Sequence, residues 1–340
     1  MKKRGFRGLS AVCLGLFLLQ TIGCRQETLP AARNGFALDT AVSVTIYALS
    51  GSASPGAVLD GCFEQLSRYE QLFSAELENS DIGRLNRAKG QPVVLSPQTA
   101  ELLETGLEYG KLTNGALDIT IRPVSRLWDF HGDPALPDPD ALSAAAELVD
   151  YTRLVLENDT ARLTDPDAAV DLGAIAKGYI ADRLAAYLTE NGVTSALIDL
   201  GGNIVAVGDK RGENWSIGIR DPKDASALAA VIPVKNASVV TSGTYERGFT
   251  LDGVRYHHLL DPKTGWPAEN GLSSVTIVSS RSVDGDALST ACFVLGEDKA
   301  LSLIESLPGI EALFIRDTGE LTATSGLLYT VPAPEPVHSS

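Results

Sequence analysis

Apolar residues recur along the chain with two different periods, and each period predicts a type of secondary structure. Every second residue is apolar at Val42, Val44 and Ile46, which predicts a strand with one buried face. Helical spacing, with apolar residues three or four positions apart, covers residues 58–73. The same spacing predicts two more helices, around residues 102–107 and 180–188, which Asn114-Gly115 and Asn191-Gly192 would close.

Short apolar runs bounded by turn residues predict further strands. Two pairs of such runs flank Asn158-Asp159-Thr160 and Leu251-Asp252-Gly253, and each pair predicts a β-hairpin. Other strand-like runs cover residues 196–200, 204–207, 215–220, 229–234, 275–278 and 310–315. Hairpins mixed with helices favour an α+β fold, with mainly antiparallel sheets and packed helices, over a doubly wound parallel sheet.

Residues 284–296 combine a helical pattern with candidate chemistry. Apolar residues recur at i, i+3, i+4 and i+7 and predict an amphipathic helix with these side chains inward: Leu288, Ala291, Cys292 and Leu295. Asp286 and Thr290 would then share a face, where a carboxylate and a hydroxyl offer the hard oxygen ligands that Mg²⁺ prefers. An acid near a helix start is also favoured by the helix dipole, so the pair alone does not establish a metal site.

The N-terminus has the pattern of an export signal. Residues 2–7 are rich in Lys and Arg, and residues 11–19 form an apolar run that is too short to span a bilayer. Gly23-Cys24 resembles a bacterial lipoprotein cleavage site, which predicts removal of residues 1–23 and lipidation of Cys24. Plain secretion with a free thiol at Cys24 is the alternative. We therefore expect an exported protein, lipid-anchored to a bacterial membrane on the periplasmic side or the cell surface.

The rest of the chain divides into three predicted parts. Residues 24–34 form a polar tether, residues 35–330 a folded domain, and residues 331–340 a Pro-rich tail that we expect to be disordered. No repeat or low-complexity linker interrupts residues 35–330.

Charge and cysteine content exclude several classes of function. Removing residues 1–23 would take the formal net charge from −15 to −19, which disfavours nucleic acid as a partner. Only Cys62 and Cys292 lie within the predicted domain, and their spacing suits neither a zinc site nor an obvious disulfide. The whole chain has four histidines, which argues against a His-based metal site.

Several polar segments are candidate site elements, although each is weak alone. Walker A and G-x-G-x-x-G sequences are absent. Residues 173–178 place a glycine turn and Lys177 at a helix start, which can bind phosphate, although a plain turn with a solvated Lys is equally compatible. Gly201-Gly202-Asn203 ends a strand, and residues 241–247 form a polar stretch. His258, three residues before Asp261 in a Pro-Lys-Thr-Gly turn, is a candidate acid–base group.

Six of these motifs, in order, resemble the ApbE family of FAD:protein FMN transferases. They are Gly115-Ala-Leu-Asp118-Ile-Thr120, Asp171-Leu-Gly-Ala-Ile-Ala-Lys177-Gly178, Asp199-Leu-Gly-Gly-Asn203, Ser242-Gly-Thr-Tyr-Glu-Arg247, His258-Leu-Leu-Asp-Pro-Lys-Thr-Gly265 and Asp286-Ala-Leu-Ser-Thr290. The resemblance covers about residues 36–324 and implies an ApbE-like fold.

The resemblance also implies roles for individual residues. Mg²⁺ would be held by Asp286, Thr290 and the main-chain carbonyl of Ala174. FAD would be contacted by these residues: Leu38, Ala116, Leu117, Asp118, Asp171, Lys177 and His258. The family's early Met-Gly-Thr motif reads Leu38-Asp39-Thr40 here, so Asp39 takes the place of a glycine. His258 matches the family's catalytic histidine, while the sequence leaves open whether His258 or Asp261 removes the hydroxyl proton.

The activity that the resemblance implies is Mg²⁺-dependent transfer of FMN from FAD to a Thr or Ser hydroxyl, with release of AMP. The acceptor would be an exported or membrane-bound flavoprotein. Two alternatives remain open at this point. In an FAD pyrophosphatase, water replaces the hydroxyl and yields free FMN and AMP. A non-catalytic flavin-binding lipoprotein would only capture the ligand.

Overall fold

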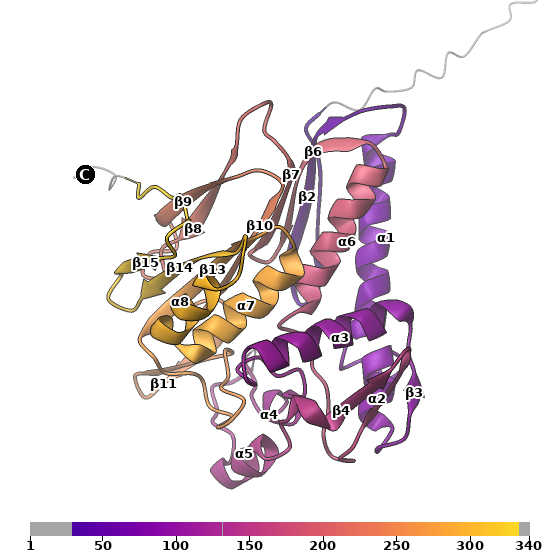
Figure 1. Cartoon of the computed structure of the whole chain (residues 1–340), viewed down its shortest axis with the longest axis vertical. Coiled ribbons are helices and arrows are strands. Elements are labelled where there is room, and N and C mark those ends of the chain that lie inside the picture. The colour runs from indigo at the N-terminus through magenta and orange to yellow at the C-terminus, as the bar shows by residue number, and fades with distance from the viewer. Residues whose placement is uncertain (1–28, 131, 333–340) are drawn as a thin grey trace, which may run out of the picture.

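An eight-stranded antiparallel sheet forms the framework of the protein (Figure 1). The computed structural model describes residues 29–130 and 132–332. Along the sheet, the strands are β1 (Ala31–Ala37), β2 (Thr40–Leu49), β6 (Val193–Leu200), β7 (Asn203–Gly208), β10 (Ala237–Gly243), β13 (Leu272–Ser279), β14 (Glu311–Arg316) and β15 (Leu321–Ala323). Alternating burial in β2 matches its two-residue apolar period.

Four helices pack on one face of this sheet (Figure 1). They are α1 (Pro55–Phe73), α6 (Ala176–Glu190), α7 (Ser282–Leu295) and α8 (Glu297–Glu305). Helix α7 lies against β10 and β13 and is also covered by α6 and α8. Residues on several sides of α7 are therefore buried, Val283, Ala287 and Phe293 among them, while Leu295 is only half-buried. The expected amphipathic pattern does not hold for α7, because neighbours cover it on more than one side.

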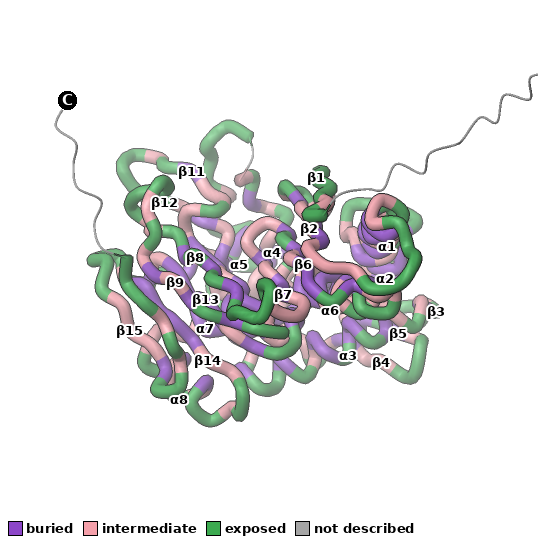
Figure 2. The backbone as a smooth tube through the Cα atoms, turned by 90° about the horizontal axis from the view of Figure 1, so that it is seen from above, coloured by how far each residue is buried: buried purple, intermediate pink, exposed green. Residues whose placement is uncertain are grey.

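The opposite face of the sheet is covered by a two-stranded ribbon, β8 (Trp215–Arg220) and β9 (Leu228–Val234). Side chains of β8 are alternately buried and exposed, and Trp215, Ile217 and Ile219 pack on sheet residues such as Leu313. The sheet is thus buried on both faces in this region. Figure 2 shows this buried centre, and it also shows that β1 at the sheet edge is mostly exposed.

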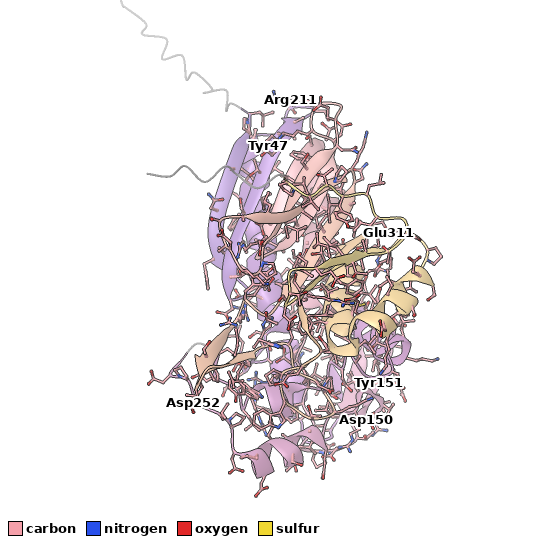
Figure 3. The ribbon with its side chains drawn as sticks, turned by 90° about the vertical axis from the view of Figure 1, so that its left-hand side faces the viewer. Tyr47, Asp150, Tyr151, Arg211, Asp252 and Glu311 are labelled. Atoms are coloured by element: carbon pink, nitrogen blue, oxygen red, sulfur yellow. The ribbon has the colours of Figure 1, made fainter. Side chains whose placement is uncertain are left out.

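A smaller group of elements lies at one end of the sheet (Figure 1). It contains α2 (Asp81–Arg87), α3 (Pro97–Leu112), α4 (Arg122–Ser125), α5 (Pro139–Ala146), η1 (Tyr151–Arg153), and a three-stranded sheet of β3 (Val93–Val94), β5 (Thr160–Leu163) and β4 (Leu154–Glu157). The hairpin of β11 (Gly248–Leu251) and β12 (Val254–His257) extends outward, with Asp252 at its tip (Figure 3). Its Phe249 packs with Trp128 and Leu142 in a separate apolar cluster.

The α+β prediction with mainly antiparallel sheets is confirmed, as are both predicted hairpins. Strand β1 begins at Ala31, so the end of the predicted tether, residues 24–34, belongs to the sheet. The predicted signal segment and the Cys24 lipidation site lie outside the described residues, as does most of the predicted tail. Within residues 29–130 and 132–332, no helix combines the length and hydrophobicity needed to cross a bilayer.

Candidate functional site

The centre of the candidate site is the junction between the start of α6 and the middle of α7. The Gly178 N–H of α6 donates a 2.8 Å hydrogen bond to Oδ2 of Asp286 in α7. A Cβ atom at Gly178 would lie 2.4 Å from the Ser282 carbonyl oxygen, so this close approach requires glycine. The glycine of the Lys177-Gly178 motif therefore allows a backbone amide to reach a carboxylate on the neighbouring helix.

Lys177 supplies the positive charge at this junction. Its Nζ lies 3.5 Å from Oδ1 of Asp286 and donates a 3.2 Å hydrogen bond to the Gly173 carbonyl. Asp286 is 3% exposed, and this burial raises its pKa, whereas Lys177 and the Gly178 amide act in the opposite direction. The junction thus holds a buried carboxylate that a nearby cation stabilises in its charged form.

Contacts from two sides hold α7 in place. Asp182 of α6 accepts hydrogen bonds from the backbone amides of Ser282 (2.7 Å) and Val283 (3.0 Å), and so caps the start of α7. On the sheet side, Ser242 Oγ of β10 lies 2.8 Å from Ser289 Oγ and 3.4 Å from Thr290 Oγ1. These contacts fix the rotation of α7, and with it the direction of Asp286 and Thr290.

The oxygen ligands predicted for Mg²⁺ are compatible with this geometry. Asp286 and Thr290 lie one turn apart on α7, and Ala174 follows Gly173 in the turn that Lys177 contacts. No group of three or more His, Cys, Asp and Glu side chains suited to a metal occurs in the described part of the chain. A site here would therefore depend on one carboxylate, one hydroxyl and one carbonyl. This ligand set suits Mg²⁺, which keeps several waters and binds substrate phosphates.

Asp171 lies at the edge of this junction and is held by several partners. It accepts hydrogen bonds from the Gly173 amide (2.9 Å) and the Ser125 hydroxyl (2.8 Å), and Arg122 lies 3.7 Å away. The carboxylate therefore shapes the turn that leads into α6. Because Asp171 is only half-buried, one side of it remains open to a ligand.

Asp118 has its own hydrogen-bond partners. Oδ1 accepts from the amide and hydroxyl of Thr120, and Oδ2 accepts from the Tyr151 amide. The Asp171 amide donates to the Ile119 carbonyl at 2.8 Å, so this segment runs beside Asp171. Ala116 and Leu117, just before it, are buried. Contact of Ala116, Leu117 and Asp118 with FAD stays a prediction.

The two adjacent histidines have different environments. His258 Nδ1 lies 3.3 Å from the Arg247 carbonyl, and burial, Arg247 and Lys177 lower the pKa of His258 to about 3. His257 is buried edge-on against Phe293, and its Nδ1 has no hydrogen-bond partner among residues 29–130 and 132–332. A carbonyl at Nδ1 favours the tautomer with the proton on that nitrogen, which leaves Nε2 of a neutral His258 as a proton acceptor.

Asp261, the other candidate base, is a turn residue. It accepts a 2.9 Å hydrogen bond from the Lys263 amide, and its own amide donates to the Trp266 carbonyl. These bonds define the Pro-Lys-Thr-Gly turn. Of the two candidates, the geometry favours His258.

The structure gives individual contacts to two charged residues, Glu246 and Arg247, which the sequence placed in a motif without assigning either of them a role. Glu246 is exposed beside the junction, where Lys177 and Asp286 act on the pKa of its carboxyl in opposite directions, Lys177 lowering it and Asp286 raising it. Arg247 hydrogen-bonds to the Asp39 carbonyl and carries the carbonyl that His258 contacts. Their sequence signals were an unusually polar stretch, residues 241–247, and the motif Ser242-Gly-Thr-Tyr-Glu-Arg247 within it.

Known proteins match this chain over most of its length. The ApbE family matches residues 38–314. An FAD:protein FMN transferase from Treponema pallidum is 38% identical over 325 residues, which covers 90% of each chain. Another from Klebsiella pneumoniae is 38% identical over 269 residues, covering 77% of this chain and 83% of the relative.

Solved structures show the same fold. The crystal structure of the ApbE protein from Thermotoga maritima superposes with a TM-score of 0.79 at 31% identity, covering 87% of this chain and 97% of the other. The flavin transferase ApbE from Vibrio cholerae has the same TM-score and coverage at 29% identity. The region that matches the family contains the α6–α7 junction, His258 and Arg247. Because this match spans residues 38–314, most of the chain, the chain belongs to the ApbE family.

Proposed function

We propose that this protein transfers the FMN part of FAD to a Thr or Ser hydroxyl of an acceptor protein and releases AMP. The relatives that match most of the chain are FAD:protein FMN transferases, which supports this activity. The observation that carries the assignment is the buried Asp286 carboxylate, held by the Gly178 amide beside Lys177. A site for simple flavin capture has no need of a buried carboxylate and a cation beside a neutral histidine.

The residues of the junction suit a diphosphate substrate. FAD is anionic and the chain carries a formal charge of −15, so binding needs local positive charge. Lys177 and the N–H groups at the start of α6 provide it. Asp286, Thr290 and the Ala174 carbonyl would hold Mg²⁺, which when bound supplies Lewis-acid polarisation of the diphosphate and neutralises charge on the leaving AMP.

His258 is the proposed proton acceptor. The acceptor hydroxyl oxygen forms a bond to the FMN phosphorus, the bond from that phosphorus to the AMP oxygen breaks, and the hydroxyl proton passes to Nε2 of His258. Burial and the charges of Arg247 and Lys177 lower the pKa of His258, so its imidazole is neutral at physiological pH and the lone pair of Nε2 is available.

We further propose that the protein is exported, that Cys24 anchors it to a bacterial membrane, and that its acceptor is exported or membrane-bound. The basic and apolar N-terminal segment supports export, and Gly23-Cys24 supports lipidation. Cys24→Ser should move the protein from the detergent-phase membrane fraction to the soluble fraction. Retention of the variant in the membrane would contradict the anchor.

The activity is tested with the mature protein, FAD, Mg²⁺ and a flavoprotein acceptor with an accessible Thr. Covalent flavin on the acceptor is detected by in-gel fluorescence and by a mass increase equal to one FMN less water. His258→Asn should abolish labelling of the acceptor. Its matched control, His257→Asn, should leave most of the labelling. Free FMN and AMP without labelled acceptor would identify a pyrophosphatase, and unreacted FAD would exclude both enzymes.

A further inference from the structure

A strained turn lies at the edge of the candidate site. Leu38 and Asp39 form the two-residue connection between β1 and β2, where Ala37 pairs with Thr40. Both have positive φ, 53° and 60°, a backbone region that residues other than glycine rarely adopt. Two-residue hairpin loops commonly have positive φ at both positions, and Asp tolerates this region, so the unfavourable residue is Leu38.

Three contacts hold this turn against the body of the protein. The Arg247 guanidinium donates a 3.0 Å hydrogen bond to the Asp39 carbonyl and lies 3.4 Å from the Asp39 carboxylate. Glu70 of α1 accepts a 3.1 Å hydrogen bond from the Leu38 amide. Thr40 packs over Gly201, where an added Cβ would lie 2.2 Å from the Thr40 hydroxyl. The turn thus contacts the glycine turn between β6 and β7 as well as Arg247.

Arg247 also contacts the candidate base through its main chain. Its carbonyl accepts from the His258 amide and faces His258 Nδ1, both at 3.3 Å. One residue therefore holds the strained turn with its side chain and the imidazole with its backbone. Its neighbour Glu246 lies over Gly202, with Oε1 3.6 Å from a Cβ added there. The Leu38–Asp39 turn, Gly201-Gly202 and His258 therefore follow one another along one edge of the candidate site. We call this edge the rim.

We propose that Arg247 is a positioning residue that joins the Leu38–Asp39 turn to His258, so that the turn closes over the flavin at the place where the base acts. This inference rests on the proposed function, because it assigns the enclosed ligand as FAD. A main-chain and a charged oxygen of Asp39 both face the guanidinium, and a Lys side chain cannot bridge two such oxygens in the same way. The contact of the Arg247 guanidinium with both Asp39 oxygens therefore distinguishes a positioning role from attraction by charge alone, because Lys keeps the charge and loses the double contact.

The test compares Arg247→Gln and Arg247→Lys with a matched control, Arg255→Gln. Arg255 lies in β12, in the hairpin that directly follows Arg247, and its Nε donates to the Thr244 carbonyl. Two readouts are measured on the full mature chain: the FAD dissociation constant from flavin fluorescence without turnover, and KM and kcat for transfer. Thermal unfolding and circular dichroism establish that each variant is folded.

Both Arg247 variants should raise the dissociation constant and the KM for FAD about tenfold, the usual scale for losing a charge-assisted hydrogen bond. The kcat should change much less, since the Arg247 carbonyl still holds His258, and Arg255→Gln should resemble the wild type. Full rescue by Lys would overturn the proposal in favour of long-range charge, and an equal effect of Arg255→Gln would also overturn it. If the wild type binds FAD but transfers nothing, the proposed function fails, while the binding comparison still tests the turn.

Discussion

Helices α6 and α7 meet inside the protein, whereas the Leu38–Asp39 turn and Arg247 meet at its surface. At the helix junction, Asp286 is 3% exposed and each contact is backed by packed secondary structure. At the rim, Asp39 is exposed and β1 is a sheet edge with little cover. Packing holds the side chains of the α6–α7 junction in place. The Leu38–Asp39 turn instead depends on a few polar contacts that hold a strained backbone.

This difference suggests a division of labour. Groups that bind a metal and a diphosphate need fixed positions, because small displacements reduce electrostatic stabilisation strongly. In the proposed function the rim admits FAD and then an acceptor segment, which is consistent with a turn held by only a few polar contacts. Changes at the junction should therefore affect both chemistry and stability, and changes at the rim should affect mainly binding.

The largest effect is expected from Asp286→Ala. Loss of the proposed metal-ligand carboxylate should remove several kcal/mol of transition-state stabilisation, so the transfer rate should fall by about 10³-fold or more. Circular dichroism should show a folded protein, since the substitution removes a buried charge without adding volume. Asp284→Asn, two residues away on α7, is the matched control and should keep most activity. Full activity of Asp286→Ala would refute the metal assignment.

The next effect tests the close approach of the two helices. Gly178→Ala places a Cβ 2.4 Å from the Ser282 backbone and should lower the free energy of unfolding by about 3 kcal/mol, the upper range for overpacking. Gly285→Ala on α7 meets the side chain of Val240 at 2.8 Å, which can move, and should cost only about 1 kcal/mol. Urea unfolding measures both. Equal costs would show that the junction is not specifically tight at Gly178.

A smaller effect should depend on pH, through the Asp182 cap of α7. Burial raises the pKa of Asp182 to about 6, so the folded state holds this proton more tightly than the unfolded chain. Its contribution to stability is therefore complete below about pH 4 and is lost as the pH rises through about 6. Between pH 7.5 and 4, wild type should gain about 2 kcal/mol in unfolding free energy relative to Asp182→Asn.

The control for this prediction is Asp224→Asn at the surface. Hydrogen bonds from Ser226 lower the pKa of Asp224, so its contribution is present at neutral pH and is lost on acidification. The stability that wild type has relative to Asp224→Asn, measured as the free energy of unfolding, should therefore fall on acidification, whereas that relative to Asp182→Asn should rise. A pH-independent difference for Asp182→Asn would mean that the cap does not titrate in this range.

The smallest effects are expected at the rim. Asp39→Val places a β-branched residue at a φ of 60° and should lower the free energy of unfolding by about 1–2 kcal/mol. Asp39→Asn keeps a residue that tolerates this region and loses only an exposed ion pair, so it should cost less than about 0.5 kcal/mol. Thermal unfolding compares them. If both substitutions were neutral, the turn would not be strained.

Much of the fold followed from local pattern. The two-residue period of β2 and the helical period of α1 reflect direct contact with one face of the core, so the sequence sufficed for both. Turn residues located both hairpins, because a tight turn allows only a few backbone conformations and therefore favours particular residues. Helix α7 was different, since its burial on several sides depends on α6, α8 and two strands, which no window of sequence contains.

The candidate site shows the same limit. Lys177, His258, Asp286 and Thr290 were recognised because short motifs carried them in family order. Asp182 was not recognised, and Glu246 and Arg247 were recognised only as motif members without a role. Their roles depend on partners distant in sequence: Ser282, Gly202 and Asp39. A charged residue in a polar stretch is usually a solvated one, so local sequence alone could not set them apart.

The sequence by itself determined many of the elements, the antiparallel character of the sheets, and the family to which the chain belongs, because these depend on periodicity and short motifs. Only the tertiary structure decided which amide holds Asp286, which side chain caps α7 and which arginine holds the Leu38–Asp39 turn. Those choices depend on contacts between segments up to 208 residues apart. Such contacts form only when the whole chain has packed, and they turn a set of polar motifs into one site.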